Sequence, residues 1–409
     1  MKKHWGHASD ASSPAEAIQP CFDLRGITSP ENRTAWILWG LLFLAGAAMV
    51  MHGSSRTDVT SLWLSSGNWL AGQGLYFDGS GIGGFVYFPQ AAILFIPFAL
   101  LPKILGEVLW RFVSIAAFAV GLYYFMQLAT GSAKKNIFLL ATLISIPLAW
   151  DCVRNGQSTL VMAGLMLLAV VCASQSRWWP AALLLTLSVA FKPLALVLWL
   201  LVLVLYRPLT WRLLLVMGAV VLFPFLIQNY VYVMQQYSEC IRIMTTAAHV
   251  GVVASGWTSP FNTLREFGAD VPESLQTIIR FAAAFATLAL CYAAVRWNDP
   301  KRASIFIYSF GAMYLMLFSP RTENNTYVML GPAIAVFMAD ALLVKHRIST
   351  GIMLGGIALV IVGHRTVAHL LIPRSNDTWV SPIMAVLFCC YLLASLFSER
   401  SRTAAPAES

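Results

Sequence analysis

The sequence predicts an all-α polytopic membrane protein, and three observations support this fold class. Of the 409 residues, 58% are hydrophobic and only 11% are charged, whereas about a quarter of the residues in a soluble domain are charged. The mean hydropathy is +0.71. Apolar runs of about twenty residues recur along the chain, and each could cross a hydrocarbon layer of about 30 Å. This composition excludes a soluble enzyme, a secreted disulfide scaffold and a disordered chain.

The net charge of +9 fits the same class. Most lysines and arginines flank apolar runs, where they fix helix orientation and contact anionic headgroups. A nucleic-acid-binding protein would need a basic stripe on a soluble surface, which this sequence lacks. We therefore expect membrane lipids as partners and no nucleic acid.

The N-terminal region predicts a cytosolic tail followed by a retained signal anchor. Residues 1–33 are polar, and the run 34–51 has no clear cleavage site. Positive charge before this run places the N-terminus in the cytosol and Asp58 on the external side. The stretch 59–70 carries Trp63 and Trp69 among polar residues, a pattern typical of an interfacial helix.

The next apolar stretches leave two topologies open. Tyr87–Pro102 is short and bounded by prolines, so it either spans or lies at the membrane surface. The run 179–206 would form a helix about 42 Å long and bury Lys192 in the membrane. Two short segments that meet at Lys192-Pro193 avoid both problems. If they do meet there and Tyr87–Pro102 does not cross, the total is about twelve spans. The other predicted spans are 34–51, 107–128, 136–151, 158–174, 211–230, 275–297, 303–319, 326–344, 348–371 and 379–397.

Positive charges orient the second half of the chain in both topologies. Arg207, Arg296 and Lys345 lie in turns that the positive-inside rule places in the cytosol. The predicted organisation is a cytosolic tail 1–33, a single transmembrane domain 34–397 and a cytosolic tail 398–409. Its external loops are 52–106 and 231–274, and the segment 319–325 lies on the same external face. We expect a plasma (inner) membrane protein with its active site on the periplasmic or extracellular side.

Polar residues gather on that predicted external face. They are Asp58, Asp151, Arg154, Asn155, Gln157, Lys192, His249, Arg321, Glu323 and Asn324. Ionisable groups at membrane depth are functional candidates. Each also has a structural reading: Asp58 as a helix N-cap, Lys192 as a snorkelling side chain, residues 154–157 as helix caps and Arg321 with Glu323 as an ion pair.

The combination indicates a particular chemistry. Cations at a membrane face suit a phosphate held at headgroup depth, and a carboxylate suits a general base that removes a hydroxyl proton. No H-E-x-x-H, Walker A or G-x-S-x-G pattern is present. The sequence suggests no second carboxylate beside Asp58 except Asp151, so we expect no bound metal and no cofactor.

Several short motifs in order resemble a known family. They are Asp58 with its Trp-rich helix, F-V-Y-F-P-Q-A-A-I-L-F-I-P-F-A-L-L-P (85–102), N-G-Q (155–157), A-F-K-P (190–193) and Ser319-Pro320. Together they are similar to glycosyltransferase family 87, which has the type C fold and includes polyprenyl-phosphate-mannose-dependent mannosyltransferases. The resemblance implies that Tyr87–Pro102 lies at the surface and that Asp58 is catalytic. The sequence departs from the family at Asn324 and Asn325, where family members often have histidines.

The resemblance, together with these residues, implies an inverting hexosyltransferase, with mannose as the sugar. A polyprenyl-phosphate-linked donor would give its sugar to a lipid or glycan acceptor. Asp58 is the predicted base, and Lys192, Arg154 and Arg321 are the predicted donor-phosphate ligands. The other predicted substrate-binding residues are Gln157, Asn155, Glu323, Asn324, Tyr87 and His249. A flippase or transporter of lipid-linked sugars, or a non-catalytic partner of a glycan-assembly complex, remains the alternative.

Overall fold

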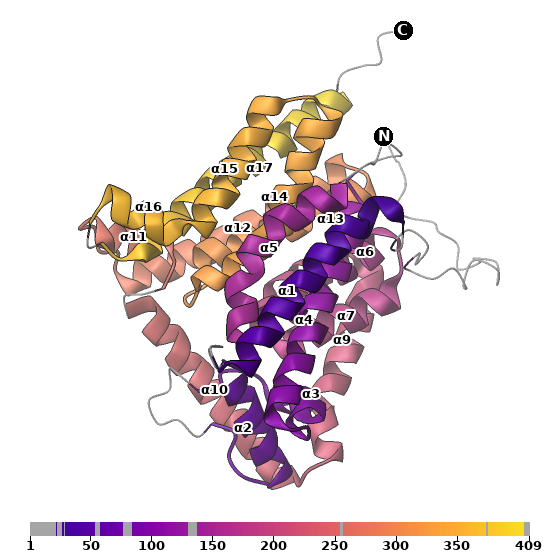
Figure 1. The fold of residues 1–409 in the computed structure, drawn as a ribbon, viewed down its shortest axis with the longest axis vertical. Helices are drawn as coiled ribbons and strands as arrows, with labels where there is room; N and C mark the ends of the chain where they lie inside the picture. The colour runs from indigo at the N-terminus through magenta and orange to yellow at the C-terminus, as the bar shows by residue number, and fades with distance from the viewer. Residues whose placement is uncertain are drawn as a thin grey trace, which may run out of the picture.

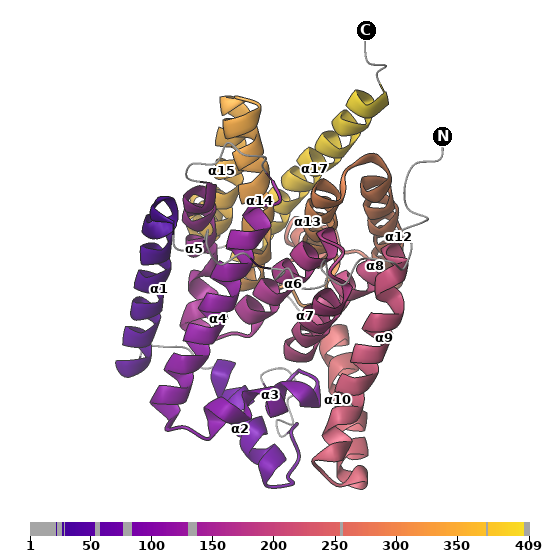
Figure 2. The same ribbon diagram turned by 90° about the vertical axis from the view of Figure 1, so that its right-hand side faces the viewer.

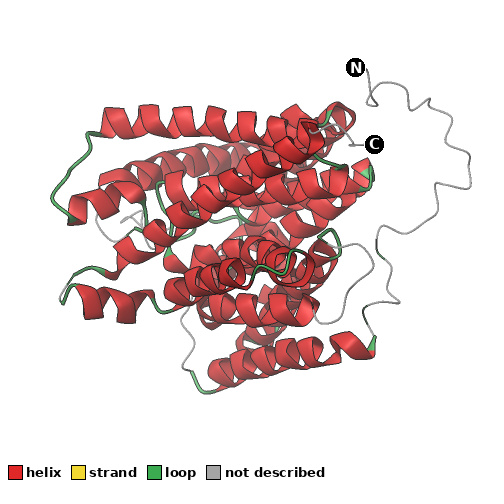
Figure 3. Ribbon diagram, turned by 90° about the horizontal axis from the view of Figure 1, so that it is seen from above, coloured by secondary structure: helices red, strands yellow, loops and turns green. Residues whose placement is uncertain are grey.

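The computed structural model describes residues 22, 27, 29–53, 58–76, 84–129, 137–253, 257–373 and 375–404, and every regular element in them is helical (Figure 3). This confirms the predicted helical fold class. The helices are α1 (Arg33–Met51), α2 (Asp58–Leu70), α3 (Pro89–Ala99), α4 (Lys103–Met126), α5 (Ile137–Asn155), α6 (Thr159–Ser174), α7 (Trp178–Phe191), α8 (Leu196–Leu205), α9 (Arg207–Leu222), α10 (Tyr230–Val253), α11 (Pro260–Glu266), α12 (Glu273–Trp297), α13 (Pro300–Phe318), α14 (Leu330–Ala339), α15 (Ile348–Val362), α16 (His364–Leu371) and α17 (Val380–Ala404).

Short helical turns join several of these helices. They are Pro30–Asn32, Pro193–Ala195, Phe223–Leu226, Asn324–Met329, the π-turn Asp340–Val344 and Asp377–Trp379. Helices α2, α3 and α10 gather at one end of the molecule, and the far end of α17 lies at the other (Figures 1 and 2).

Seven helical stretches in the described residues are long and apolar enough to cross a membrane. They are Pro30–Met51, Lys103–Met126, Ile137–Asn155, Arg207–Leu226, Glu273–Trp297, Asn324–Val344 and Asp377–Arg400. The pair α15 and α16 makes an eighth if the two helices form one span. The chain is therefore a multi-pass membrane protein, while the total of twelve spans stays a prediction.

Helix α6 forms the centre of the bundle, since all of its residues are buried. It packs against α4, α7 and α13. A Cβ added to Gly164 would lie 2.4 Å from the Ala117 backbone, so α4 and α6 touch backbone to backbone. Such close approach through small residues is a common basis of helix packing in membranes. The N-terminal half of α6 is thereby held against α4, and this helix begins two residues after Gln157 of the N-G-Q motif.

The predicted break at Lys192-Pro193 is confirmed. Helix α7 ends at Phe191, Lys192 has an extended backbone (φ −153°, ψ 123°), and a 3₁₀ turn begins at Pro193. Proline lacks an N–H and disfavours a helical conformation in the residue before it. Two short helices therefore replace one long span and leave Lys192 at their junction.

The structure differs from the sequence-based expectations in two segments. The external loop 231–274 contains α10, whose 24 residues bury one side while Val231 and Ile241 on the other remain exposed. The stretch 348–371 is not one straight helix, because α15 and α16 meet at an angle of 85° at Gly363.

Helix α3 has 11 residues, hence a length of about 16 Å, which is too short to cross a bilayer.

Candidate active site

A cavity of about 1150 Å³ opens among α2, the α5–α6 turn, the α7–α8 break, α10, α12 and the segment after α13. Its charged lining residues, among those described, are Asp58, Lys192, Arg280, Arg321 and Glu323. Apolar side chains that include Val197, Leu200 and Phe281 line another part of it. The cavity thus joins a charged region to an apolar one, as an amphiphilic ligand requires.

Gln157 lies at the centre of the charged region. Its Nε2 donates to Asp58 Oδ2 at 2.6 Å and to Glu323 Oε2 at 3.0 Å. Its Oε1 accepts from Thr159 Oγ1 at 3.4 Å, and Thr159 Oγ1 accepts from Lys192 Nζ at 2.7 Å. Because carboxylates only accept hydrogen bonds, these neighbours fix the orientation of the amide. One side chain therefore connects two carboxylates from distant parts of the chain.

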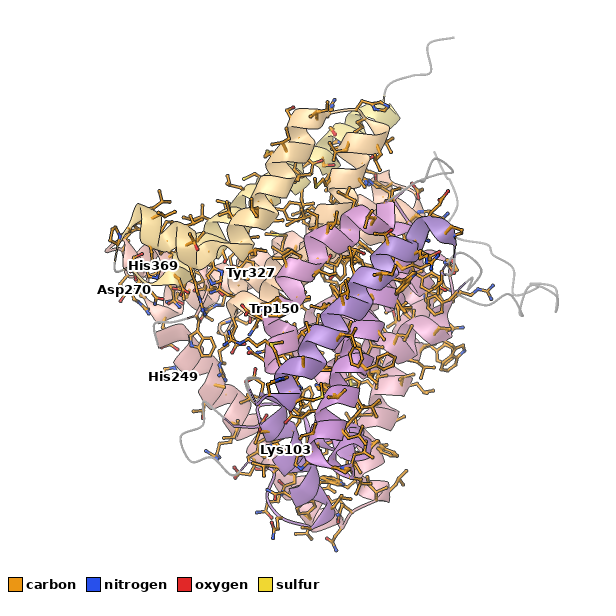
Figure 4. All side chains as sticks on the ribbon, in the orientation of Figure 1. Lys103, Trp150, His249, Asp270, Tyr327 and His369 are labelled. Carbon is orange, nitrogen blue, oxygen red and sulfur yellow. The ribbon has the colours of Figure 1, made fainter. Side chains whose placement is uncertain are left out.

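The backbone around Gln157 depends on Gly156. This residue has φ +64°, a conformation that favours glycine. A Cβ there would lie 2.2 Å from Val59 Cγ2. The α5–α6 turn is therefore pressed against the residue that follows Asp58, which brings the predicted base and Gln157 together. Figure 4 labels Trp150 on α5 and Tyr327 in the turn after Glu323, the elements that approach each other here.

Two consecutive residues of α4 hold this turn from the other side. Trp110 Nε1 donates to the Gly156 carbonyl at 2.8 Å. Arg111 Nε donates to the Val153 carbonyl at 2.9 Å, and its Nη1 lies 3.2 Å from Glu107 Oε2. Arg111 is 1% exposed. Carbonyls at a helix C-terminus lack intrahelical partners, so these side chains complete the end of α5 and fix the position of the turn.

Glu323 is held as a carboxylate. Burial alone would raise its pKa, but Lys192, the Asn325 and Gln157 amides and Arg321 together lower the pKa below its ordinary value. Asn325 Nδ2 donates to the same Oε2 atom at 2.9 Å. Two carboxylates thus share one amide, and the neighbour of Asp58 is Glu323. The sequence-based expectation that named only Asp151 is corrected, because a residue 265 positions away was not recognisable as a neighbour.

Two arginines line the cavity near α12 and α13. Arg321 lies over the Trp257 ring, with 4.5 Å between its Cζ and the ring centroid. Arg280 donates through Nε to the Phe318 carbonyl at 3.1 Å and through Nη2 to Gln276 Oε1 at 3.1 Å. Arg280 was not among the residues predicted from the sequence, because an arginine near the start of an apolar span also fits a snorkelling role.

The structure brings together most, but not all, of the predicted site residues. Asp58, Tyr87, Gln157, Lys192, Arg321 and Glu323 line the cavity. Among the described residues, the cavity lining lacks Arg154, Asn155, Asn324 and His249.

The four other candidates lie beside the cavity. Arg154 and Asn155 end α5. Asn324 Oδ1 accepts from Ser381 Oγ at 2.8 Å, and His249 on α10 pairs with Glu273 at 3.0 Å (Figure 4). Their roles as ligands stay predictions.

No group of three or more metal-ligating side chains occurs within the described ranges. Asp58 and Glu323 together supply only two carboxylates, and Gln157 Nε2 donates a hydrogen bond to an oxygen of each. Metal independence therefore stays a prediction that a chelator experiment must test.

Comparison with known proteins identifies the family. No curated protein matches the sequence. The family model of glycosyltransferase family 87 matches residues 85–320, which is more than half of the chain. The match includes Tyr87, Gln157, Lys192 and Arg280, whereas Asp58, Arg321 and Glu323 lie outside it. The chain therefore belongs to glycosyltransferase family 87.

Proposed function

We propose that this membrane glycosyltransferase moves a hexose, most simply mannose, from a polyprenyl-phosphate-linked donor to a lipid or glycan acceptor. The observation that carries the proposal is the cavity itself. Asp58, fixed by Gln157, shares it with Lys192 and Arg321. A general base and phosphate-binding cations are the two components that this transfer requires.

In the proposed reaction, the acceptor oxygen attacks the anomeric carbon on the face opposite the phosphate. The bond between the anomeric carbon and the phosphate oxygen breaks, and its electron pair goes to that oxygen. Asp58 takes the proton of the acceptor hydroxyl as the new glycosidic bond forms. The products are an inverted glycoside and polyprenyl phosphate, and no further reactant is needed.

The cations contribute most in the transition state. A phosphodiester carries one negative charge, and the departing phosphate gains a second one before it is protonated. Lys192 and Arg321 line the cavity on the side of Glu323. They would stabilise the growing charge more than the ground state, which is the condition for catalysis.

The remaining lining residues suggest where the other parts of the donor bind. Tyr87, Gln157 and Glu323 present polar groups that suit sugar hydroxyls. Val197, Leu200 and Phe281 suit the first prenyl units, and Leu200 and Phe281 are also exposed. Positive charges in the turns support an external location for the cavity, with cytosolic termini.

The test uses purified protein, a labelled polyprenyl-phosphate mannose and crude lipid and glycan acceptors. We expect wild type to transfer label and Asp58→Asn to lose about two to four orders of magnitude in turnover, while donor binding is retained. Equal transfer by both proteins would refute the base assignment. Addition of a chelator should leave the wild-type rate unchanged.

A flippase would give a different result in the same assay. Reconstituted protein would then move the lipid-linked sugar between leaflets without breaking the glycosyl bond, and Asp58→Asn would move it equally well. Binding of donor by both proteins, with translocation and no transfer to any acceptor, would favour this alternative over the transferase.

A further inference from the structure

The charges of the cavity do not cancel among the described residues. Its lining holds two carboxylates, Asp58 and Glu323, and three cations, Lys192, Arg280 and Arg321. Lys192 and Arg321 both act on Glu323, since both help to lower its pKa. The described lining thus carries one cation more than it has carboxylates, and Arg280 is one of the three cations.

The partners of Arg280 are neutral. Its two hydrogen bonds within the described residues go to the Phe318 carbonyl and the Gln276 amide oxygen. Its guanidinium lies 5.0 Å from the centroid of the Phe261 ring. The carboxylate on its own helix, Glu273, is 3.0 Å from His249 and lies outside the cavity lining. Arg280 is thus oriented by its surroundings, and within the described residues no carboxylate forms an ion pair with it, although Glu273 acts on it by charge.

These contacts leave part of the guanidinium available to a ligand. Arginine has five N–H donors, and only two of them are engaged by the Phe318 and Gln276 oxygens. The fixed planar fork of a guanidinium matches two oxygens of a phosphate. Arg280 also comes from the same turn of α12 as Phe281 and Thr277, which line the cavity beside it.

We infer that Arg280 is the principal phosphate ligand of the lipid-linked donor, and that its charge balances the single negative charge of the phosphodiester. This assignment rests on the proposed function and deepens it. Phe281, the residue next to Arg280, lines the cavity and is 65% exposed. The phosphate is thereby placed where the polar region of the cavity meets its apolar part. This matches a prenyl phosphate, in which the charged phosphate is joined directly to the apolar chain.

The inference is tested by direct binding, which needs no acceptor. Purified protein in lipid nanodiscs is titrated with a polyprenyl monophosphate and with the uncharged polyprenol of equal length. For Arg280→Gln we expect a Kd for the phosphate that is about tenfold to a hundredfold higher, since hydrogen bonds to charged groups contribute this much. The Kd for polyprenol should stay within about twofold of wild type.

Two further variants complete the design. Arg280→Met keeps an unbranched side chain against Phe261 and should reproduce the loss if Arg280→Gln does not fold. Arg242→Gln removes an exposed arginine of α10 that pairs with Glu239 at 2.8 Å, and it should bind both lipids as wild type does.

Three outcomes would overturn the inference. An unchanged Kd for the phosphate in Arg280→Gln would remove Arg280 as a ligand but leave the donor class standing. An equal loss of phosphate and polyprenol binding would show that Arg280 only shapes the apolar region. A wild-type protein that does not prefer the phosphate to the alcohol would refute both this inference and the proposed donor.

Discussion

Two groups of charged residues join distant helices in this protein, and they do so in opposite ways. We call one the Arg302 cluster, and its members are Arg302, Asp340, Lys345 and Glu399. The Arg302 Nη2 atom lies 2.6 Å from Glu399 Oε1 and 3.2 Å from Asp340 Oδ2, and Lys345 Nζ lies 2.7 Å from Asp340 Oδ2. The guanidinium also lies over the Phe306 and Phe337 rings.

We call the other group the cavity network, and its members are Asp58, Gln157, Thr159, Lys192 and Glu323. Here a neutral amide donates a hydrogen bond to both carboxylates, and the lysine donates to a hydroxyl. The opposite charges of a direct ion pair neutralise each other and leave little charge for a ligand. An amide between carboxylates fixes their positions but keeps their charges available, which is what a catalytic site requires.

Among the changes that test this comparison, Gln157→Glu should have the largest effect on activity. A third carboxylate would then stand 2.6 Å and 3.0 Å from the oxygens of Asp58 and Glu323. Like charges at this distance force one group to bind a proton or to move away. We expect transfer to fall by about two to three orders of magnitude, measured as kcat/KM with labelled donor.

The matched control for this change is Gln228→Glu. Gln228 donates to the Trp69 carbonyl at 2.8 Å and lies outside the cavity lining. It should transfer sugar at nearly the wild-type rate. A similar loss in both variants would mean that an added glutamate disables the protein wherever it stands.

The second prediction concerns stability and not turnover. Arg302→Gln leaves Asp340 and Glu399 without their shared cation, and both lie in largely buried surroundings. Removing one partner of a buried ion pair costs about 3 kcal/mol, so the thermal unfolding temperature in detergent should fall clearly. The turnover of the protein that remains folded should equal that of wild type. A loss of turnover at unchanged stability would erase the distinction between the two groups.

The third prediction tests the support of the α5–α6 turn. Trp110→Phe keeps the ring packing but removes the hydrogen bond to the Gly156 carbonyl, which is worth about 1 kcal/mol. A displaced Gln157 should lower kcat several-fold with little change in KM. Trp39→Phe removes a comparable bond, from Nε1 to Thr142 Oγ1 at 3.1 Å, far from the cavity. It should lose stability without losing kcat.

The sequence predicts those features of the fold that depend on length and charge. The break at Lys192-Pro193 followed from a run too long for a bilayer with a buried lysine in it, and both constraints are local. Helix α10 was missed because polar and charged residues such as Gln235, Glu239 and Arg242 interrupt its apolar residues, so no continuous apolar run marks it. The bend at Gly363 depends on how α16 packs against the Asp377–Trp379 turn, which the sequence does not display.

In the candidate site too, the features that depend on local sequence could be predicted, and the contacts between distant residues could not. Asp58, Gln157 and Lys192 could be proposed from their positions at helix ends. The contact of Gln157 with Glu323 joins residues 166 positions apart, and no local pattern encodes it. Arg280 was missed for a related reason, since its neighbours Phe318 and Phe261 come from other helices and only their arrangement separates a ligand-facing arginine from a snorkelling one.

The smallest expected effect is a pH dependence of stability that comes from Glu323. The net interactions of this carboxylate lower its pKa below the ordinary value of 4.5. A group whose pKa is lower in the folded state stabilises the fold above its unfolded pKa, and the contribution disappears as the pH falls through the folded value. Wild type should therefore exceed Glu323→Gln in unfolding temperature at pH 6 to 7 by a few degrees, and the gap should close as the pH is lowered below about 4. Asp340→Asn, measured in parallel, reports on the Arg302 cluster. A gap for Glu323→Gln that is independent of pH would mean that the charge of Glu323 is not what the cavity network holds in place.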